Sequence, residues 1–222
     1  MFDRIAPKYD LLNHILSAGI DRHWRKKLIN RLAKSHPQSI LDIATGTGDI
    51  AIAAADLHPK KITAIDISEK MLAVAAGKVK EKKLESIIEL KRANSESLSY
   101  DDNSFDAITV AFGVRNFEHL QEGFKEMHRV LKPNGICLIL EFSQPVHFPV
   151  KQLYRFYSAY ILPRIGGVIS KEKSAYQYLP ESVKAFPQGN SFLELFSSAG
   201  FKNTTWQPLT FGIASLYEGH KT

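Results

Sequence analysis

Three carboxylates surround a glycine turn in the first third of the chain, and their spacing is typical of a cofactor site. Asp42 lies in an apolar run that leads into Gly46-Thr47-Gly48 and an alanine-rich helical pattern beginning at Asp49. A second apolar run ends in Asp66. Such a strand–turn–helix–strand unit suits an adenosine-containing cofactor, because glycines let the backbone approach the ligand and the second acid can accept the ribose hydroxyls.

The charges around this turn distinguish between cofactors. Gly46-Thr47-Gly48-Asp49-Ile50-Ala51 also fits the dinucleotide pattern G-x-G-x-x-G/A. However, we expect Asp49 to lie where a pyrophosphate would bind and Asp42 to lie just beneath it, and both would repel a diphosphate. They favour S-adenosylmethionine, which carries a sulfonium and an ammonium. The alternative is a plain strand–helix turn with Asp49 as a first-turn acid, but this leaves Asp66 without a role.

Composition limits the classes of protein to consider. The 222 residues predict a single domain spanning 1–222, and no run of about 18 uncharged apolar residues predicts a spanning helix. The first residues lack the apolar region of a signal peptide, and the single Cys137 lies in an apolar run. These features predict a cytoplasmic protein without a disulfide inside the chain. The eight histidines show no ligand spacing, so we predict no metal.

Apolar runs rich in β-branched residues alternate with segments of helical period, which predicts an α/β fold with a parallel sheet. The predicted strands are Ser39–Ala44, Lys61–Asp66, Ile87–Arg92, Phe105–Phe112 and Gly135–Phe142. The predicted helices are Trp24–Lys34, Asp49–Leu57, Ser68–Lys82 and Glu118–Leu131, with Ser68 as an N-cap and Lys132–Gly135 as a stop signal.

The end of the chain departs from this alternation. Thr204–Leu209 and Ile213–Lys221 are too close in sequence to be parallel neighbours, so we expect an antiparallel hairpin at one edge of the sheet. Five parallel strands with a terminal hairpin are typical of the Rossmann-like sheet of class I S-adenosylmethionine-dependent methyltransferases. A helical insertion, residues 143–190, follows the fifth strand, where it can form a lid or an extra core layer. Within it, Lys151–Leu162 is apolar around most of a helix, which predicts a helix that is buried or lines an apolar ligand cavity. The N-terminal segment 1–24 can close the same pocket.

Several longer motifs resemble the quinone-biosynthesis C-methyltransferases, which methylate demethylmenaquinol and the related ubiquinone precursor. The resemblance covers nearly the whole chain. Its most specific strings are Phe112-Gly113-Val114-Arg115-Asn116 and Tyr178-Leu179-Pro180-Glu181-Ser182, and others are Ile5–Asn13, Ala93–Glu96, Arg129–Gly135 and Leu140–Ser143. By this similarity, S-adenosylmethionine contacts Thr47, Asp66, Asn94 and Ser95. Ala111 stands where many members have a cofactor-side serine, and Asn134 replaces a usual glycine.

The resemblance implies C-methylation of a prenylated quinol, most simply demethylmenaquinol. Deprotonating a phenol with a pKa near 10 at about pH 7 requires roughly 4 kcal/mol of differential stabilisation. We assign Arg115 to stabilising that phenolate and Asn116 to binding the other ring oxygen. In the alternative interpretation, Arg115-Asn116 only caps the start of a helix, and Arg115 is a surface arginine. Tyr9 and Asp10 can reach the pocket, and the proton acceptor stays open among Asp10, His14 and water. Tyr154, Tyr157, Tyr160 and Tyr176 are expected to line the acceptor cavity.

Competing interpretations come from other classes. The net charge of +6 and the basic run Arg22–Lys27 fit a nucleic-acid methyltransferase, but the chain lacks the Asp/Asn-Pro-Pro-Tyr string after the fourth strand, so we expect no nucleic-acid partner. The others are an NAD-dependent reductase, a methyltransferase for another small apolar acceptor, and a non-catalytic cofactor-binding subunit. Because a prenylated substrate resides in the membrane, we also expect peripheral contact at its inner face. The oligomeric state is left open.

Overall fold

The fold is an open α/β sheet in which parallel strands are joined by helical crossovers. A computed structural model describes residues 19–157, 160 and 180–222. Its seven strands are ordered β3-β2-β1-β4-β5-β7-β6. They are β1 (Ser39–Ile43), β2 (Lys61–Asp66), β3 (Ile88–Arg92), β4 (Phe105–Ala111), β5 (Leu131–Phe142), β6 (Lys202–Leu209) and β7 (Ala214–His220). The first five are parallel, and β7 pairs antiparallel with both β5 and β6, which confirms the predicted sheet and terminal hairpin.

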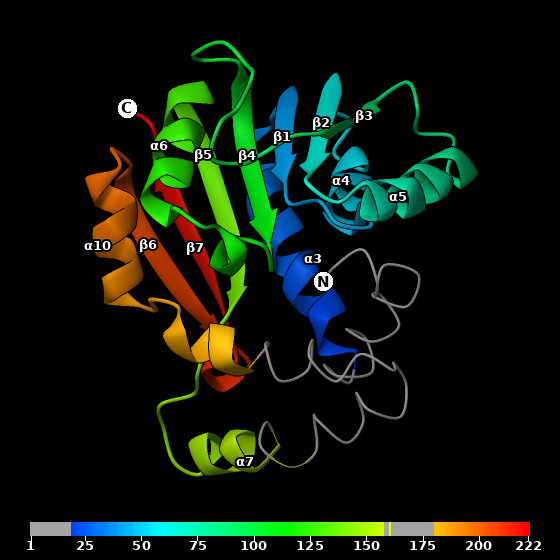
Figure 1. The fold of residues 1–222 in the computed structure, drawn as a ribbon. Helices are drawn as coiled ribbons and strands as arrows, with labels where there is room; N and C mark the ends of the chain where they lie inside the picture. The colour runs from blue at the N-terminus through cyan, green and yellow to red at the C-terminus, as the bar shows by residue number, and fades with distance from the viewer. Residues whose placement is uncertain (1–18, 158–159, 161–179) are drawn as a thin grey trace.

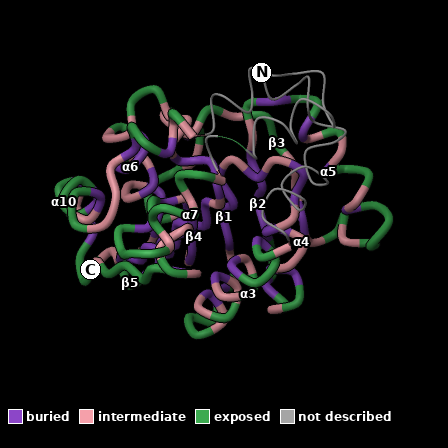
Figure 2. The backbone as a smooth tube through the Cα atoms, turned by 90° about the horizontal axis from the view of Figure 1, so that it is seen from below, coloured by how far each residue is buried: buried purple, intermediate pink, exposed green. Residues whose placement is uncertain are grey.

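Helices cover both faces of the sheet (Figure 1). The longer helices are α3 (Ile20–Leu32), α4 (Asp49–Ala55), α5 (Glu69–Glu81), α6 (Leu120–Val130), α7 (Val150–Phe156) and α10 (Asn190–Ser198). Side chains of α3, α4 and α5 pack in one core cluster, whereas those of α6 and α10 pack in a second. Neighbouring residues of one strand enter different clusters, as Ile40 and Leu41 do, because strand side chains alternate between faces. Buried residues follow the strands between the helices (Figure 2).

Local capping confirms one prediction and corrects another. The Ser68 hydroxyl accepts a hydrogen bond from the Met71 amide at 3.2 Å, so Ser68 caps α5 as expected. The predicted stop signal, by contrast, lies within β5, which begins at Leu131 directly after α6 ends. The strand is irregular there: Asn134 has a φ of 65°, and the β4–β5 register shifts between Phe105 and Ala107. Asparagine tolerates this left-handed conformation, so the chain turns without leaving the sheet.

The two expected lid segments differ from their predictions. The helix α3 begins at Ile20, and Trp24 is buried in the core with its indole N–H donating to the Thr210 hydroxyl at 2.7 Å. Trp24 therefore anchors the start of α3 in the core, and residues 1–18 lie outside the described residues.

The insertion was expected to contain a helix that is buried or lines a cavity, and burial is contradicted for the part of it that the structure describes. No residue of α7 is buried, and Leu153 and Phe156 are 65% and 57% exposed. The helix stands beyond the end of the sheet at which β5 ends (Figure 1). Residues 161–179 are outside the described residues. Within those that are described, no helix has the length and apolar character needed to cross a membrane.

Candidate active site

The glycine turn after β1 has the backbone geometry that a close ligand requires. Gly46 and Gly48 have φ values of 57° and 84°, which favour glycine because it lacks a Cβ. The turn is tied to β2, since the Thr45 amide donates to the Ile65 carbonyl at 2.9 Å. A Cβ on Gly48 would lie 3.1 Å from the Ala75 Cβ, whereas one on Gly46 would meet nothing within 4 Å. Gly48 thus packs against α5, and Gly46 faces open space.

Asp66 is fixed at the end of β2 by backbone donors. Its Oδ2 accepts from the Gly46 amide and its Oδ1 from the Ser68 amide, both at 2.8 Å. The carboxylate lines a pocket beside the turn. Each carboxylate oxygen has a second lone pair. Asp66 can therefore hold the turn and still accept the two hydroxyls of a ribose.

Asp42 lies beneath the pocket, where it was expected, but it does not line the pocket as a cofactor-binding residue would. It is 1% exposed and is absent from the pocket lining. The hydroxyls of Thr45 and Thr109 each donate to it at 2.6 Å. Burial raises the pKa of the Asp42 carboxyl to about 6, although these hydroxyls oppose the shift. Asp42 thus supports the turn from below.

Asp49 also differs from its expected position, and this weakens the charge argument made from sequence. Its two carboxylate oxygens pair with Lys78 Nζ at 2.7 Å and with Arg25 Nη1 at 3.0 Å. It does not line the pocket. Two cations offset its charge, so Asp49 alone does not exclude a pyrophosphate.

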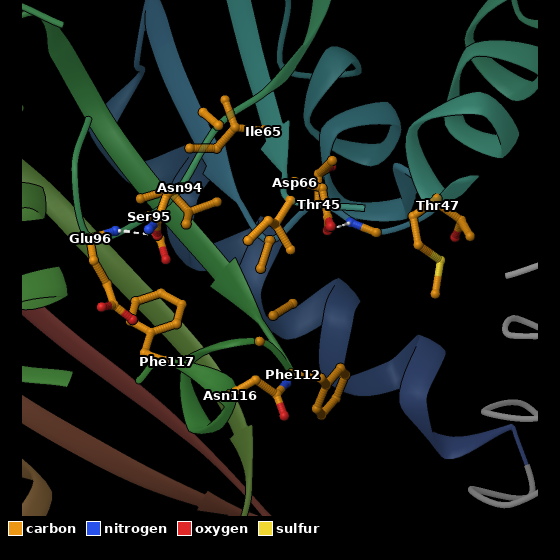
Figure 3. A pocket seen from close by; sticks show the side chains of 18 of the residues that line it. Thr45, Thr47, Ile65, Asp66, Asn94, Ser95, Glu96, Phe112, Asn116 and Phe117 are labelled. Atoms are coloured by element: carbon orange, nitrogen blue, oxygen red, sulfur yellow. Dashed lines mark hydrogen bonds between the residues drawn. The ribbon is translucent and has the colours of Figure 1, made fainter. Parts of the chain in front are cut away.

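The pocket, about 230 Å³ in volume, lies at the carboxyl ends of the parallel strands (Figure 3). Of the predicted site residues, it brings together Gly46, Thr47, Asp66, Asn94, Ser95, Ala111 and Asn116. Asp42, Gly48 and Arg115 do not line it. Tyr9 and Asp10, with His14 and Tyr176, lie outside the described residues.

The sequence analysis missed several lining residues, of which the main ones are Arg25, Ile67, Met71, Glu96, Phe112 and Phe117. For Ile67 a signal was present. The sequence places this apolar residue directly after the strand-end acid. In the structure its side chain is 65% exposed, which suits contact with a flat purine. No sequence feature distinguished Arg25 as a pocket residue, because it lies within a run of basic residues.

Arg115, which was expected to stabilise a phenolate, forms a buried ion pair. Its Nη1 lies 2.7 Å from Glu141 Oε1, and the two side chains are 5% and 0% exposed. The guanidinium also lies 5.4 Å from the centre of the Phe142 ring. The alternative of a surface arginine is therefore wrong. Glu141 was missed, although an acid near the end of a fully apolar strand was the available signal.

This ion pair holds the turn that carries Asn116 into the pocket. Glu141 Oε1 accepts from the Phe142 amide at 2.8 Å, and Oε2 accepts from the Arg115 amide at 3.3 Å. Arg115 and Asn116 belong to one 3-10 turn, Val114–Asn116. Anchoring Arg115 from both its amide and its side chain therefore fixes the position of Asn116.

The described tyrosines of the insertion do not line the pocket. Burial raises the pKa of the Tyr154 phenol, and the nearby charge of Arg115 opposes that shift. Burial likewise raises the pKa of Tyr157, whereas Tyr160 is 55% exposed. Their predicted place in an acceptor cavity is not seen in the described residues.

The sequence model of the ubiE/COQ5 methyltransferase family matches residues 1–221 of this chain. The chain belongs to this family. A demethylmenaquinone methyltransferase from Bacteroides fragilis is 51% identical over 222 residues, which cover 100% of this chain and 91% of that protein. A ubiquinone/menaquinone biosynthesis C-methyltransferase UbiE from Geotalea daltonii is 47% identical, with coverage of 100% and 94%.

Solved structures show the same fold at low identity. The [4+2]-cyclase SpnF aligns with a TM-score of 0.71 and 18% identity over 100% of this chain and 94% of its own. A SAM-dependent methyltransferase from Aquifex aeolicus aligns with a TM-score of 0.59 and 17% identity, covering 87% and 89%. Because a cyclase shares the fold, the fold alone does not determine the reaction. Family membership identifies an S-adenosylmethionine-dependent methyltransferase, which confirms the predicted class and cofactor.

The pocket fits that cofactor. Asp66 and the open side of Gly46 suit a ribose that lies against the backbone. Ile67 and Met71 supply apolar surface beside Asn94 and Ser95, as an adenine ring needs. A Cβ on Gly113 would lie 2.5 Å from the Ala44 Cβ, so the ends of β1 and β4 approach closely next to the pocket.

Proposed function

We propose that this protein transfers the methyl group of S-adenosylmethionine to a ring carbon of a prenylated quinol, with demethylmenaquinol as the acceptor. The main support is the full-length similarity to relatives named demethylmenaquinone methyltransferase, at 51% identity in Bacteroides fragilis and 44% in Chlorobaculum tepidum. Other relatives are named for both ubiquinone and menaquinone biosynthesis, so the benzoquinol precursor is the competing acceptor.

The geometry supports different tasks for the residues around the proposed acceptor position. Bound S-adenosylmethionine supplies an electrophilic methyl group, so the protein must align the ring carbon and increase its nucleophilicity. Asn116 lines the pocket and can donate a hydrogen bond to a ring oxygen, while Phe112 and Phe117 offer apolar walls. The charge of Arg115 is balanced by Glu141, so we propose that Arg115 acts mainly by holding the turn of Asn116. The ring carbon that accepts the methyl group must also lose its own proton to restore the aromatic ring. We propose Asp10, His14 or water as acceptors for the phenolic proton and for this ring proton.

Product analysis tests the proposed acceptor. Purified protein is incubated with S-adenosylmethionine and either demethylmenaquinol or the benzoquinol, each with a short prenyl tail, and products are identified by mass spectrometry. We expect methylated naphthoquinol to form at least tenfold faster than methylated benzoquinol. Faster methylation of the benzoquinol would show that it, and not demethylmenaquinol, is the acceptor. If the protein binds S-adenosylmethionine but methylates neither quinol, the proposal is refuted.

We also propose that the insertion contacts the membrane in which a prenylated quinol resides. Leu153 and Phe156 of α7 are strongly exposed, and Val146 and Phe148 just before it are 70% and 80% exposed. Lys151 lies on the same helix and is exposed as well. Exposed apolar side chains beside a cation suit an anionic bilayer surface.

Liposome flotation tests this contact. The wild type is expected to float with vesicles that contain anionic lipid, and a Leu153→Ser/Phe156→Ser variant is expected to remain at the bottom of the gradient. Exposed Phe211, on the turn between β6 and β7, provides the control Phe211→Ser. Equal flotation of the double variant and the control would remove the assignment to α7.

A further inference from the structure

Arg25 reaches the cofactor pocket from α3, a helix that precedes the first strand. It lines the pocket, with Nη1 3.0 Å from Asp49 Oδ2 and Nε 3.5 Å from Asp21 Oδ2. The guanidinium lies 5.6 Å from the centre of the Phe112 ring. Its side chain is 16% exposed. Two acids and an aromatic ring thus hold a largely buried cation at one end of the pocket.

Arg25 is the only cationic side chain among the described residues that line this pocket. The acids in the same lining are Asp66, Glu96 and Glu118. S-adenosylmethionine carries a sulfonium and an ammonium, but also a carboxylate, and an anion taken from water needs a charged partner or several donors. Within the described lining, the charge that can meet this carboxylate is on Arg25.

The orientation of the ligand leads to the same residue. Asp66 and the pair Asn94-Ser95 lie after β2 and β3, where the ribose and the adenine fit. Phe112, against which Arg25 lies, follows β4 on the other side of β1. An adenosine bound at β2 and β3 therefore directs the amino-acid part of the ligand across the glycine turn, toward Arg25.

We infer that Arg25 binds the carboxylate of the methionine part of the cofactor. The hydrogen-bonding capacity for this is present. A guanidinium has five N–H donors in a planar fork that matches a carboxylate. Arg25 Nε is buried and has no hydrogen-bond partner within the described part of the chain. Asp21 and Asp49 restrict the side chain in advance, so little conformational freedom is lost when the ligand binds.

A purely structural role for Arg25, in which it joins α3 to α4 through Asp49, makes a different prediction. A structural tie would affect all ligands of the pocket alike, whereas a carboxylate partner affects only ligands that have the carboxylate. Decarboxylated S-adenosylmethionine keeps the sulfonium, the ammonium and the adenosine, so it separates the two roles.

Calorimetric titration of the full-length protein with both ligands tests the inference. For the wild type, we expect decarboxylated S-adenosylmethionine to bind about tenfold or more weaker than S-adenosylmethionine, as for a lost charge-assisted hydrogen bond. Arg25→Gln should raise the Kd of S-adenosylmethionine by a similar factor and change that of the decarboxylated ligand less than twofold. Arg25→Lys keeps the charge without the planar fork of donors, so its Kd for S-adenosylmethionine should lie between those of the wild type and Arg25→Gln. The exposed Arg22, on the same helix, gives the control Arg22→Gln.

Equal weakening of both ligands by Arg25→Gln would overturn the inference in favour of the structural tie, and so would equal affinity of the wild type for the two ligands. The second comparison needs no variant, so it holds even if Arg25→Gln fails to fold. Neither measurement requires a methyl acceptor, and the result is therefore independent of the quinol proposed above.

Discussion

The two ends of the pocket are held together in different ways. At the cofactor end, Asp66 accepts backbone amides from the turn after β1 and from the start of α5, so the strand ends themselves form the site. At the end proposed for the acceptor, the turn of Asn116 depends on a buried ion pair between Arg115 and Glu141, which come from different strand ends. Side-chain changes at the first end should therefore cost less free energy of unfolding than changes at the second, because breaking a buried ion pair leaves an unpaired charge in the core.

The largest expected effect comes from breaking the buried pair. Glu141→Leu leaves the buried guanidinium of Arg115 without a counter-charge, and we expect a loss of roughly 3–5 kcal/mol in the free energy of unfolding. Urea denaturation measures it. The double variant Arg115→Met/Glu141→Leu removes both charges and should recover most of that loss. If the single variant were as stable as the wild type, the two ends of the site would not differ in the way described.

A pH series tests the support beneath the cofactor end. The pKa of Asp42 rises from 3.8 to about 6 in the folded protein. The folded state therefore holds a proton that the unfolded chain has already released, so this contribution is fully present below about pH 4 and is lost as the pH rises through 6. Relative to Asp42→Asn, we expect the wild type to lose on the order of 2 kcal/mol between about pH 4 and pH 7.

Asparagine is a suitable comparison at this position because its amide can still bond to the hydroxyls of Thr45 and Thr109. Urea unfolding of both proteins at a series of pH values gives the difference, and groups that titrate in both proteins cancel. Parallel stability profiles for the two proteins would show that folding does not raise the pKa of Asp42, and would contradict this prediction.

At the ribose position, Asp66→Ala should raise the Kd of S-adenosylmethionine by about tenfold or more, since a charged hydrogen-bond partner is lost. Asp66→Asn keeps one acceptor oxygen and should have a smaller effect. Calorimetry with decarboxylated S-adenosylmethionine distinguishes the role of Asp66 from that of Arg25. Asp66→Ala should weaken both ligands, whereas Arg25→Gln should weaken only one. Unchanged binding by Asp66→Ala would place the ribose elsewhere.

The smallest expected effect is a gain. Ala111 lines the pocket. The family resemblance seen in the sequence implies a cofactor-side serine at this position. Ala111→Ser adds one hydroxyl on the cofactor side, and a single neutral hydrogen bond contributes about 1 kcal/mol, or roughly a fivefold lower Kd for S-adenosylmethionine. Equilibrium dialysis is sensitive enough to measure it. An unchanged or higher Kd would mean that the added hydroxyl finds no partner on the ligand.

The sequence predicted the strands well because a buried parallel strand needs a continuous apolar run, and Lys61–Asp66 was predicted to the residue. It failed where local and tertiary preferences diverge. Lys132–Gly135 reads as a turn, yet pairing with β4 and β7 draws the surrounding chain into β5. The apolar residues of Lys151–Leu162 predict burial, yet the described α7 packs against neither core cluster.

The sequence by itself determined the order of the elements, the terminal hairpin and the acid at the end of β2. These follow from the period of apolar residues and from glycine's access to positive φ, and both are local properties. Only the tertiary structure decided which charges are paired. Arg115 meets Glu141, and Asp49 meets Arg25 and Lys78, across long stretches of sequence. A charge acts on whatever lies within a few ångströms, and only the folded chain brings those groups together.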